Sequence, residues 1–342
     1  NNNGPTTSKF VVVANTYGGN LSVYKIQSNG TLKFLDNVAL SVATEPSMSV
    51  LAPNKQFLYV ASHDAYISIF SFDSATGALT ETEGSPVSIG SEPIQLAITP
   101  DGKFLYLTDQ GDYQVHIFGV DNTTGDLTYS ESIDVNDVHS VAMHPTGKFV
   151  FFGTENNEIY PYQINADNGS LTLAPNSPYV TVAADRAFWL WLQTTPDGAY
   201  LAGAGRWYGG VFGIDNVTGE LTEDALEPTD WEIKNLAVAP TLPFIYTANW
   251  SDNSIGAFKA NEADGSIDNV TGSPFDAGPQ PKAISITGDS KYLYVANFDD
   301  DSADGEFGSV MAYAISRSTG RLSKIGTYKT PGAYSKDLVA IP

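Results

Sequence analysis

The sequence predicts an all-β fold, a seven-bladed β-propeller with four antiparallel strands per blade, built as one domain over residues 9–342. Three observations support this fold: a short motif recurs seven times, a glycine turn follows each copy, and the chain ends in an apolar strand with no blade after it. Single cores usually stop growing at roughly 250 to 300 residues. One domain of 342 residues therefore requires a modular architecture.

The recurring motif places an aromatic residue at the start of a short apolar run, as in "DGKFLYLTD" from Asp101 and "DSKYLYVAN" from Asp289. Successive copies are 44 to 51 residues apart, which is the period of a four-stranded propeller blade. No amphipathic helical pattern lies between them. The seven aromatic residues are Phe10, Phe57, Phe104, Phe149, Tyr200, Phe244 and Tyr292.

Each copy predicts the same order of strands. In the third copy, "PIQLAITP" is the inner strand A, "KFLYLT" is strand B, "QVHIFGV" is strand C, and strand D follows "TTGDLT". A glycine recurs in the turn between strands C and D, where a tight hairpin needs a positive φ.

The two ends of the chain predict how the ring closes. The first copy lacks a strand A of its own, whereas the chain ends in "KDLVAIP", which predicts such a strand at residues 336–342. We therefore predict that the C-terminal strand joins the N-terminal blade. This pairing would close the ring and remove two open sheet edges.

The composition excludes several function classes. With 17 Lys and Arg against 39 Asp and Glu, the net charge is −22, which opposes binding to nucleic acid and to anionic membranes. There is no cysteine for disulfides or thiolate chemistry, and no apolar run long enough to span a membrane. The polar residues 1–8 predict a flexible leader after a processed signal or lipid anchor. We therefore expect an exported protein, which is extracellular, periplasmic or anchored at the cell surface as a lipoprotein. We also expect it to be a monomer.

The repeated motifs resemble those of a known family. Variants of P-D-G-K-F-L-Y, together with T-G-x-L-T and G-S-P, cover almost the whole chain and resemble the lactonase family of seven-bladed propellers. That family includes bacterial 6-phosphogluconolactonases and fungal carboxymuconate lactonizing enzymes. The resemblance implies a lactone-opening histidine and an anion-binding arginine, which match His139 and Arg186. The glutamate it implies in blade five is absent from "LAGAGRWYGG", and Glu155 in blade four is the nearest substitute.

The four histidines fall at different places in the repeat. Alignment with "PIQLAITP" places His139 at the start of a strand A, at the mouth of the central funnel where propeller ligands bind. It is either catalytic or held by a backbone carbonyl. The same alignment places His144 near the opposite face, where a structural role is expected. His63 lies in a B-to-C loop and could face the funnel, whereas His116 in strand C is expected to pack.

Arginine and tryptophan side chains predict a ligand face on blades five and six. Arg186 and Arg206, two of only four arginines, are expected at the funnel mouth, where guanidinium groups bind carboxylate or phosphate. All five tryptophans fall in the same two blades, which suits a sugar ring or another flat molecule. The alternative is that they fill the inner face of blade five. The predicted ligand-binding tryptophans are Trp189, Trp207, Trp231 and Trp250.

An acidic insertion in blade seven, "NFDDDSADGEFG", predicts a metal site. Asp300, Ser302 and Asp304 match the start of a D-x-S-x-D-G calcium loop, with oxygen ligands at alternate positions. Position twelve is Met311, so the usual bidentate glutamate is missing. The insertion is thus either a structural calcium site or a solvated loop, and no cofactor is required for function.

Two function classes follow from these residues. The first is a hydrolase of an anionic sugar lactone or a muconolactone-type substrate. Arg186 and Arg206 would bind the acid group, and His139 would activate water or protonate the ring oxygen, with Glu155 as its partner. The alternative is a non-catalytic exported module that binds glycan, peptide or another envelope component through the tryptophan-rich face. The missing glutamate favours the second class, whereas His139 and the two arginines favour the first.

Overall fold

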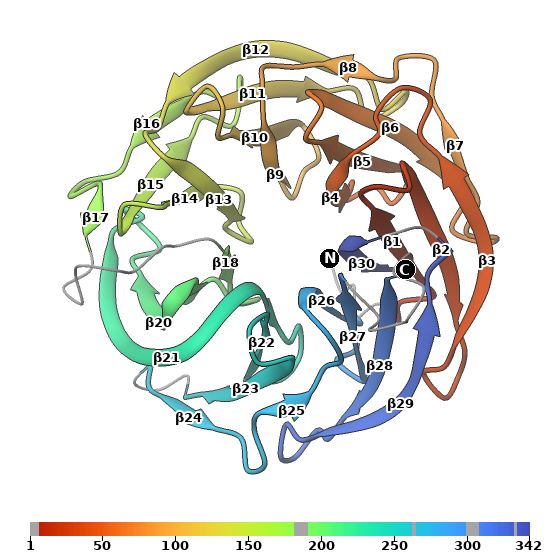
Figure 1. Cartoon of the computed structure of the whole chain (residues 1–342). Helices are drawn as coiled ribbons and strands as arrows, with labels where there is room; N and C mark the ends of the chain where they lie inside the picture. The colour runs from red at the N-terminus through yellow and green to blue at the C-terminus, as the bar shows by residue number, and fades with distance from the viewer. Residues whose placement is uncertain (1–6, 181–190, 262–264, 299–307, 332–333) are drawn as a thin grey trace.

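The computed structural model is a ring of seven blades of antiparallel β-strands (Figure 1). The inner strands of the blades line a central channel. It describes residues 7–180, 191–261, 265–298, 308–331 and 334–342, without the side chains of Trp207 and of residues 223–231. The predicted fold class is confirmed: the described residues form strands and turns, and none of them forms a helix that could cross a membrane.

The first four blades run through the N-terminal half of the chain. Blade one contains β30(Ser335–Ile341), β1(Phe10–Asn15), β2(Asn20–Ile26) and β3(Leu32–Ala39). Blade two contains β4(Pro46–Leu51), β5(Phe57–Ser62), β6(Tyr66–Phe72), β7(Leu79–Glu81) and β8(Val87–Ser88). Blade three contains β9(Pro93–Ile98), β10(Phe104–Asp109), β11(Gln114–Val120) and β12(Leu127–Asp134). Blade four contains β13(Val138–Met143), β14(Phe149–Thr154), β15(Glu158–Ile164), β16(Leu171–Leu173) and β17(Tyr179–Val180).

The remaining three blades complete the ring. Blade five contains β18(Trp191–Thr194), β19(Tyr200–Ala204), β20(Arg206–Ile214) and the first part of β21(Leu221–Val238). Blade six contains the end of β21 with β22(Phe244–Asn249), β23(Ser254–Ala260), β24(Ile267–Asn269) and β25(Phe275–Asp276). Blade seven contains β26(Pro281–Ile286), β27(Tyr292–Asn297), β28(Ser309–Ile315) and β29(Leu322–Lys329).

Strand β21 is a departure from the simple repeat. It is the outer strand of blade five, where it pairs with β20, and it continues without interruption as the inner strand of blade six, where it pairs with β22. Figure 1 shows it as one long curved arrow that joins the two blades. Between blades one and two, two and three, three and four, and six and seven, a turn or loop separates strand D from the next strand A.

The C-terminal strand closes the ring in blade one, as predicted. Strand β30 pairs antiparallel with β1 in register Val12↔Val339, so the two ends of the chain lie in one sheet. Leu338 and Ile341 are buried by this pairing. Ser8, at the end of the predicted leader, is also buried, and its Oγ accepts a hydrogen bond from the Gly288 backbone N–H.

The two repeated sequence motifs meet in the core between blades. The aromatic residue of one blade packs on the turn glycine of the next, as Phe57 does on Gly125 and Phe104 does on Gly169. Two residues further along strand B, the hydroxyl of Tyr59 donates to the Gly125 carbonyl at 3.0 Å. Motif and turn therefore recur together because each joins neighbouring blades.

Replacing Gly125 with alanine is expected to lower the free energy of unfolding by about 2–4 kcal/mol, from left-handed strain and overpacking. Gly125 has a φ of +82°, and a Cβ there would lie 2.4 Å from Cδ1 of Phe57. The matched control is Gly119→Ala on β11, where the nearest atom is the Thr128 carbonyl oxygen at 3.9 Å. Urea denaturation of both variants checks the prediction, and equal losses in the two would contradict it.

Candidate functional site

A β-bulge recurs at the start of strand A in the six blades where that part of the chain is described. In each case the register between strands A and B skips one residue of strand A. Such bulges re-aim side chains and are frequent beside active sites. The skipped residues, here called the bulge ring, are Ser47, Ile94, His139, Lys234, Lys282 and Lys336.

All six residues of the bulge ring line one pocket of about 280 Å³, here called the funnel pocket. The strands A form the inner ring of the propeller (Figure 1). Side chains that are far apart in sequence therefore meet in this pocket. Four further residues complete the lining: His63, Glu92, Gln110 and Trp191.

Three lysines give the funnel pocket a positive lining in an otherwise acidic protein. Burial, and then the neighbouring charges of Lys234 and Lys336, lower the pKa of Lys282 to about 7. Burial lowers the pKa of Lys336 to about 8. An anion beside these lysines would favour their charged form. The chemistry of the lining thus suits a carboxylate or phosphate group.

His63 contacts Lys336 inside the funnel pocket. Burial, followed by the charges of Lys336 and Lys282, lowers the pKa of His63 to about 4, so its imidazole is neutral near pH 7. Its Nε2 lies against the Lys336 ammonium, which can only donate, so Nε2 accepts and the proton is on Nδ1. Nδ1 is 3.9 Å from Oε1 of Glu92. The prediction that His63 could face the funnel agrees with this position.

His139 lies at the start of β13 and His144 directly after its end, as their register predicted. His139 is a bulge-ring residue of the funnel pocket, and its backbone carbonyl accepts a hydrogen bond from Oγ1 of Thr108 at 3.1 Å. His144 is buried, with Nδ1 2.7 Å from Oγ1 of Thr146 and Nε2 3.0 Å from the Gly198 carbonyl. His144 thus has a structural role, whereas catalysis by His139 stays a prediction.

Arg206 lies in the turn between strands B and C of blade five, as predicted. The β19–β20 ladder ends at Ala204↔Gly209, and the Gly205 N–H donates to the Tyr208 carbonyl across the turn. Arg206 is also the first residue of β20, because it pairs with Glu232 of β21. Its guanidinium group is half exposed and donates to Oε1 of Glu232 at 3.2 Å, and the same oxygen is 2.7 Å from Nζ of Lys234. Arg206 is not among the described residues that line the funnel pocket.

Trp250 lies beside the lysines. Its ring centroid is 5.8 Å from Nζ of Lys234 and 5.3 Å from Nζ of Lys282, which are cation–π distances. The ring also packs against Phe298, with centroids 5.5 Å apart. Trp191 lines the pocket directly. The repeat predicts it two residues after Trp189, on the same face of the strand.

The carboxylate of the funnel pocket comes from a different blade than predicted. Glu92, before β9 of blade three, lines the pocket, whereas Glu155 is outside the described lining and its backbone N–H donates to the Asp137 carbonyl. Several predicted residues lie outside the described part of the chain: Arg186, Trp189, Asp300, Ser302 and Asp304. The side chains of Trp207 and Trp231 are likewise outside it.

The sequence contained a signal for the lysines. Lys234, Lys282 and Lys336 each stand six positions before the proline or glycine that ends strand A, as His139 does. Alignment of all seven copies would therefore have placed the four side chains in one ring. It could not have shown that the ring forms a pocket, because that depends on the bulges.

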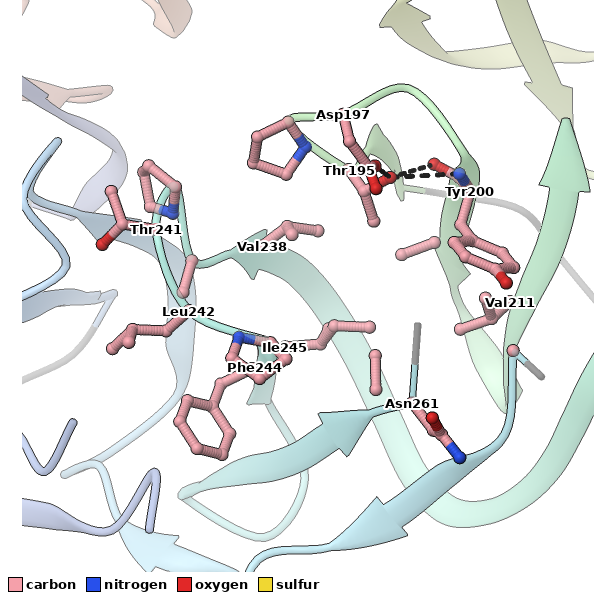
Figure 2. A pocket seen from close by; sticks show the side chains of 17 residues that line it. Thr195, Asp197, Tyr200, Val211, Val238, Thr241, Leu242, Phe244, Ile245 and Asn261 are labelled. Atoms are coloured by element: carbon pink, nitrogen blue, oxygen red, sulfur yellow. Dashed lines mark hydrogen bonds between the residues drawn. The ribbon is translucent and has the colours of Figure 1, made fainter. Parts of the chain in front are cut away.

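A second cavity, of about 290 Å³, lies between blades five and six at the other end of the strands (Figure 2). Its wall is mostly apolar, with Leu242, Phe244 and Ile245 from blade six facing Val211. Asp197, the one carboxylate in its described lining, accepts a hydrogen bond from Thr195 Oγ1 at 2.6 Å. This cavity has no described cation or imidazole, so the funnel pocket is the better candidate for chemistry.

Comparison with solved structures gives the same architecture. A candidate 6-phosphogluconolactonase of Bacteroides uniformis superposes with a TM-score of 0.84 over 97% of this chain and 99% of its own, at 17% identity. A periplasmic gluconolactonase of Pseudomonas aeruginosa superposes with a TM-score of 0.82 over 98% of this chain and all of its own, at 18% identity. At such identities the likeness concerns the fold.

Comparison of sequences gives a partial match to one curated protein. Pre-mRNA-processing factor 19 of Schizosaccharomyces pombe is 29% identical over 195 residues, which are 56% of this chain and 37% of that protein.

The family itself is identified by a match over almost the whole chain. The family described as "Lactonase, 7-bladed beta-propeller" matches residues 5–93, 43–141, 90–188 and 132–336, which together span nearly the whole chain. The chain therefore belongs to the lactonase family of seven-bladed β-propellers.

Proposed function

We propose that the protein hydrolyses a small anionic lactone in the funnel pocket. The observation that carries this proposal is the bulge ring, which brings three lysines and His139 together in a protein of net charge −22. A volume of about 280 Å³ is at the small end of ligand pockets and suits a monosaccharide-sized molecule. Membership of the lactonase family supports the reaction class.

The lysines would bind the substrate's acid group and stabilise the transition state. Lys282 and Lys336 offer ammonium groups in a partly dehydrated site, where their attraction for a carboxylate or phosphate is stronger than in water. His63 is a positioning residue in this scheme, because its Nε2 accepts from Lys336 and holds that ammonium at the pocket.

His139 would carry the proton transfers of ring opening. As a general base it removes a proton from water, whose oxygen forms a bond to the lactone carbonyl carbon. The ring C–O bond then breaks, and His139 returns the proton to the departing ring oxygen. The product is the open hydroxy acid, with no other reactant consumed.

The affinity for an anionic ligand is expected to fall as pH rises above about 7. A bound anion stabilises the Lys282 ammonium and raises its pKa in the complex. Binding is therefore at full strength below the free pKa of about 7 and weakens up to about tenfold per pH unit until the pKa of the complex is passed. Calorimetric titration with the open hydroxy-acid product between about pH 6 and 9 measures this.

Two variants test the assignment to Lys282. Lys282→Met keeps a side chain of similar length without the charge. The variant is expected to lose the fall in affinity above pH 7 that is attributed to Lys282, and to bind the anion more weakly than the wild type below pH 7. Lys259→Met, on the exposed part of β23, is the control and leaves the profile unchanged. A wild-type affinity that is constant across this pH range would contradict binding of the anion by Lys282.

A second function is favoured by an aromatic arc at the same face. Ring centroids are 5.5 Å apart for Trp250 and Phe298, 4.8 Å for Phe298 and Tyr334, and 4.9 Å for Tyr334 and Tyr17, and Tyr17 is 65% exposed. Such a surface suits stacking of sugar rings. In a glycan-binding module, wild-type protein opens no lactone above background, and Tyr17→Ala weakens glycan binding while His139→Ala does not.

We also propose that the protein is exported. The periplasmic location stated for the Pseudomonas aeruginosa gluconolactonase supports this. Fractionation of the source cells tests it, and retention of the mature chain in the cytoplasm would contradict it.

A further inference from the structure

Three side chains of blade three converge outside the funnel pocket. Asp109 ends β10, Asp112 is in the turn that follows, and His116 is on β11. Each offers one ligand atom, and these atoms all lie within 4.8 Å of one another. Asp109 and His116 are buried, whereas Asp112 is exposed.

His116 is the most informative member of this cluster. The residue is 8% exposed, and its Nε2 is buried without a hydrogen-bond partner among the described residues. Oδ2 of Asp109 is 3.6 Å from this nitrogen, which is within ion-pair distance but beyond hydrogen-bond distance. An unsatisfied imidazole nitrogen in the interior is costly, so this atom calls for a partner.

The protein holds Asp109 in place with backbone groups. Its Oδ1 accepts N–H groups from Glu92 at 2.9 Å and Gly111 at 3.0 Å, and its Oδ2 accepts the N–H of Ser91 at 2.8 Å. Each carboxylate oxygen has capacity for further partners, so Oδ2 retains a free position. Hydrogen bonds of this kind orient the ligands of metal sites.

The ligand atoms face a common space because residue 90 is glycine. A Cβ at Gly90 would lie 2.6 Å from Oδ2 of Asp109, 2.6 Å from Oδ2 of Asp112 and 3.1 Å from Nε2 of His116. Any side chain at this position would therefore push into the cluster. Glycine leaves it open.

Other blades show that the fold does not require charged groups here. At the matching positions of blade one, Nδ2 of Asn15 donates directly to Oγ of Ser22 at 2.8 Å. Blade two has Ser62 and Ser68, whose buried hydroxyls, like Nε2 of His116, have no hydrogen-bond partner among the described residues. Blade three alone among these three has a carboxylate and an imidazole, and they are spaced apart instead of hydrogen bonded.

We propose that Asp109, Asp112 and His116 bind a divalent transition-metal ion of the Zn²⁺ class. Ligand atoms at about 2.0–2.2 Å from a tetrahedral Zn²⁺ are about 3.4 Å from one another, close to the Asp109–His116 spacing. One nitrogen and two carboxylate ligands suit this class, whereas Ca²⁺ and Mg²⁺ prefer oxygen alone. Exposed Asp112 leaves the fourth position to water.

The site would hold together three segments near the funnel pocket. It joins the end of β10, strand β11 and the connection at Gly90 and Ser91, and Glu92 follows directly into the pocket lining. Metal binding at this site is therefore expected to stabilise the loop that carries Glu92. The inference is independent of the proposed lactone chemistry.

The experiment measures metal binding to the full chain after treatment with chelator and removal of the chelator. Zn²⁺ at a hundredfold excess over its Kd is expected to raise Tm by about 3 °C or more. Co²⁺ is expected to bind with a stoichiometry of one and to give the visible absorption of a tetrahedral site. No Tm shift and no Co²⁺ spectrum in the wild type would overturn the proposal.

Variants assign the binding to these residues. His116→Ser introduces the residue that blades one and two have at this position. This variant and Asp112→Asn are each expected to abolish the Zn²⁺ shift in Tm and the Co²⁺ absorption. The Tm of the metal-free protein is expected to change little in both variants. Asp134→Asn, on the exposed face of the same blade, is the control and keeps both. Signals that survive in His116→Ser and Asp112→Asn would place the metal elsewhere and overturn the assignment.

Discussion

Replacing His139 with alanine is expected to lower kcat for an anionic sugar lactone by about two to four orders of magnitude, the usual contribution of a general acid or base. His139 is in the bulge ring with the three lysines, and the neighbouring His63 is already held by Lys336. KM is expected to change little, because in the proposed scheme the lysines, not His139, bind the acid group. Steady-state kinetics on a panel of sugar lactones and muconolactones measures both constants.

The control for this prediction is Ser47→Ala. Ser47 occupies the same bulge position in blade two and lines the same pocket, but it is not required for proton transfer in the proposed scheme. A His139→Ala enzyme with wild-type kcat would assign the base to another residue. A wild-type protein without turnover on the whole panel would favour the glycan-binding module instead.

Deleting residues 336–342 is expected to prevent stable folding. The deletion removes most of β30 and so exposes an edge of β1 and the channel side of blade one. Leu338 and Ile341 are 4% and 1% exposed, and burial of each such side chain contributes about 1.5–3 kcal/mol. Together with the lost strand pairing, this approaches the 5–15 kcal/mol by which domains are typically stable. Soluble yield and thermal melting measure the effect.

Removal of Pro342 alone is the control, because it leaves β30 complete and is expected to keep the wild-type Tm. A protein truncated at residue 335 that melts at the wild-type temperature would show that closure of the ring contributes nothing to stability. Since the deletion also removes Lys336, its loss of activity by itself carries no information about the site.

The architecture was predictable because it is encoded by contacts that repeat. The aromatic residue at Phe57 and the glycine at Gly125 each recur at a regular period, and in the fold they pack on one another across a blade interface. A repeated contact leaves a repeated pattern, which can be recognised in one sequence. The same register placed His139 at the channel mouth and His144 at the other end of the strand.

The charged lining of the site depended on tertiary structure. In the sequence, the three lysines of the pocket look like ordinary polar residues at the starts of three different strands. In the structure they stand at the bulges and line one pocket: Lys234, Lys282 and Lys336. The sequence predicts Arg206 as a ligand-binding residue at the funnel mouth, but its guanidinium group donates to Glu232, a residue 26 positions away. The sequence by itself determined the ring of blades and the place of His139. Only the folded ring decided which cations meet in the pocket, because burial and charge depend on neighbours that strand register and ring closure bring together.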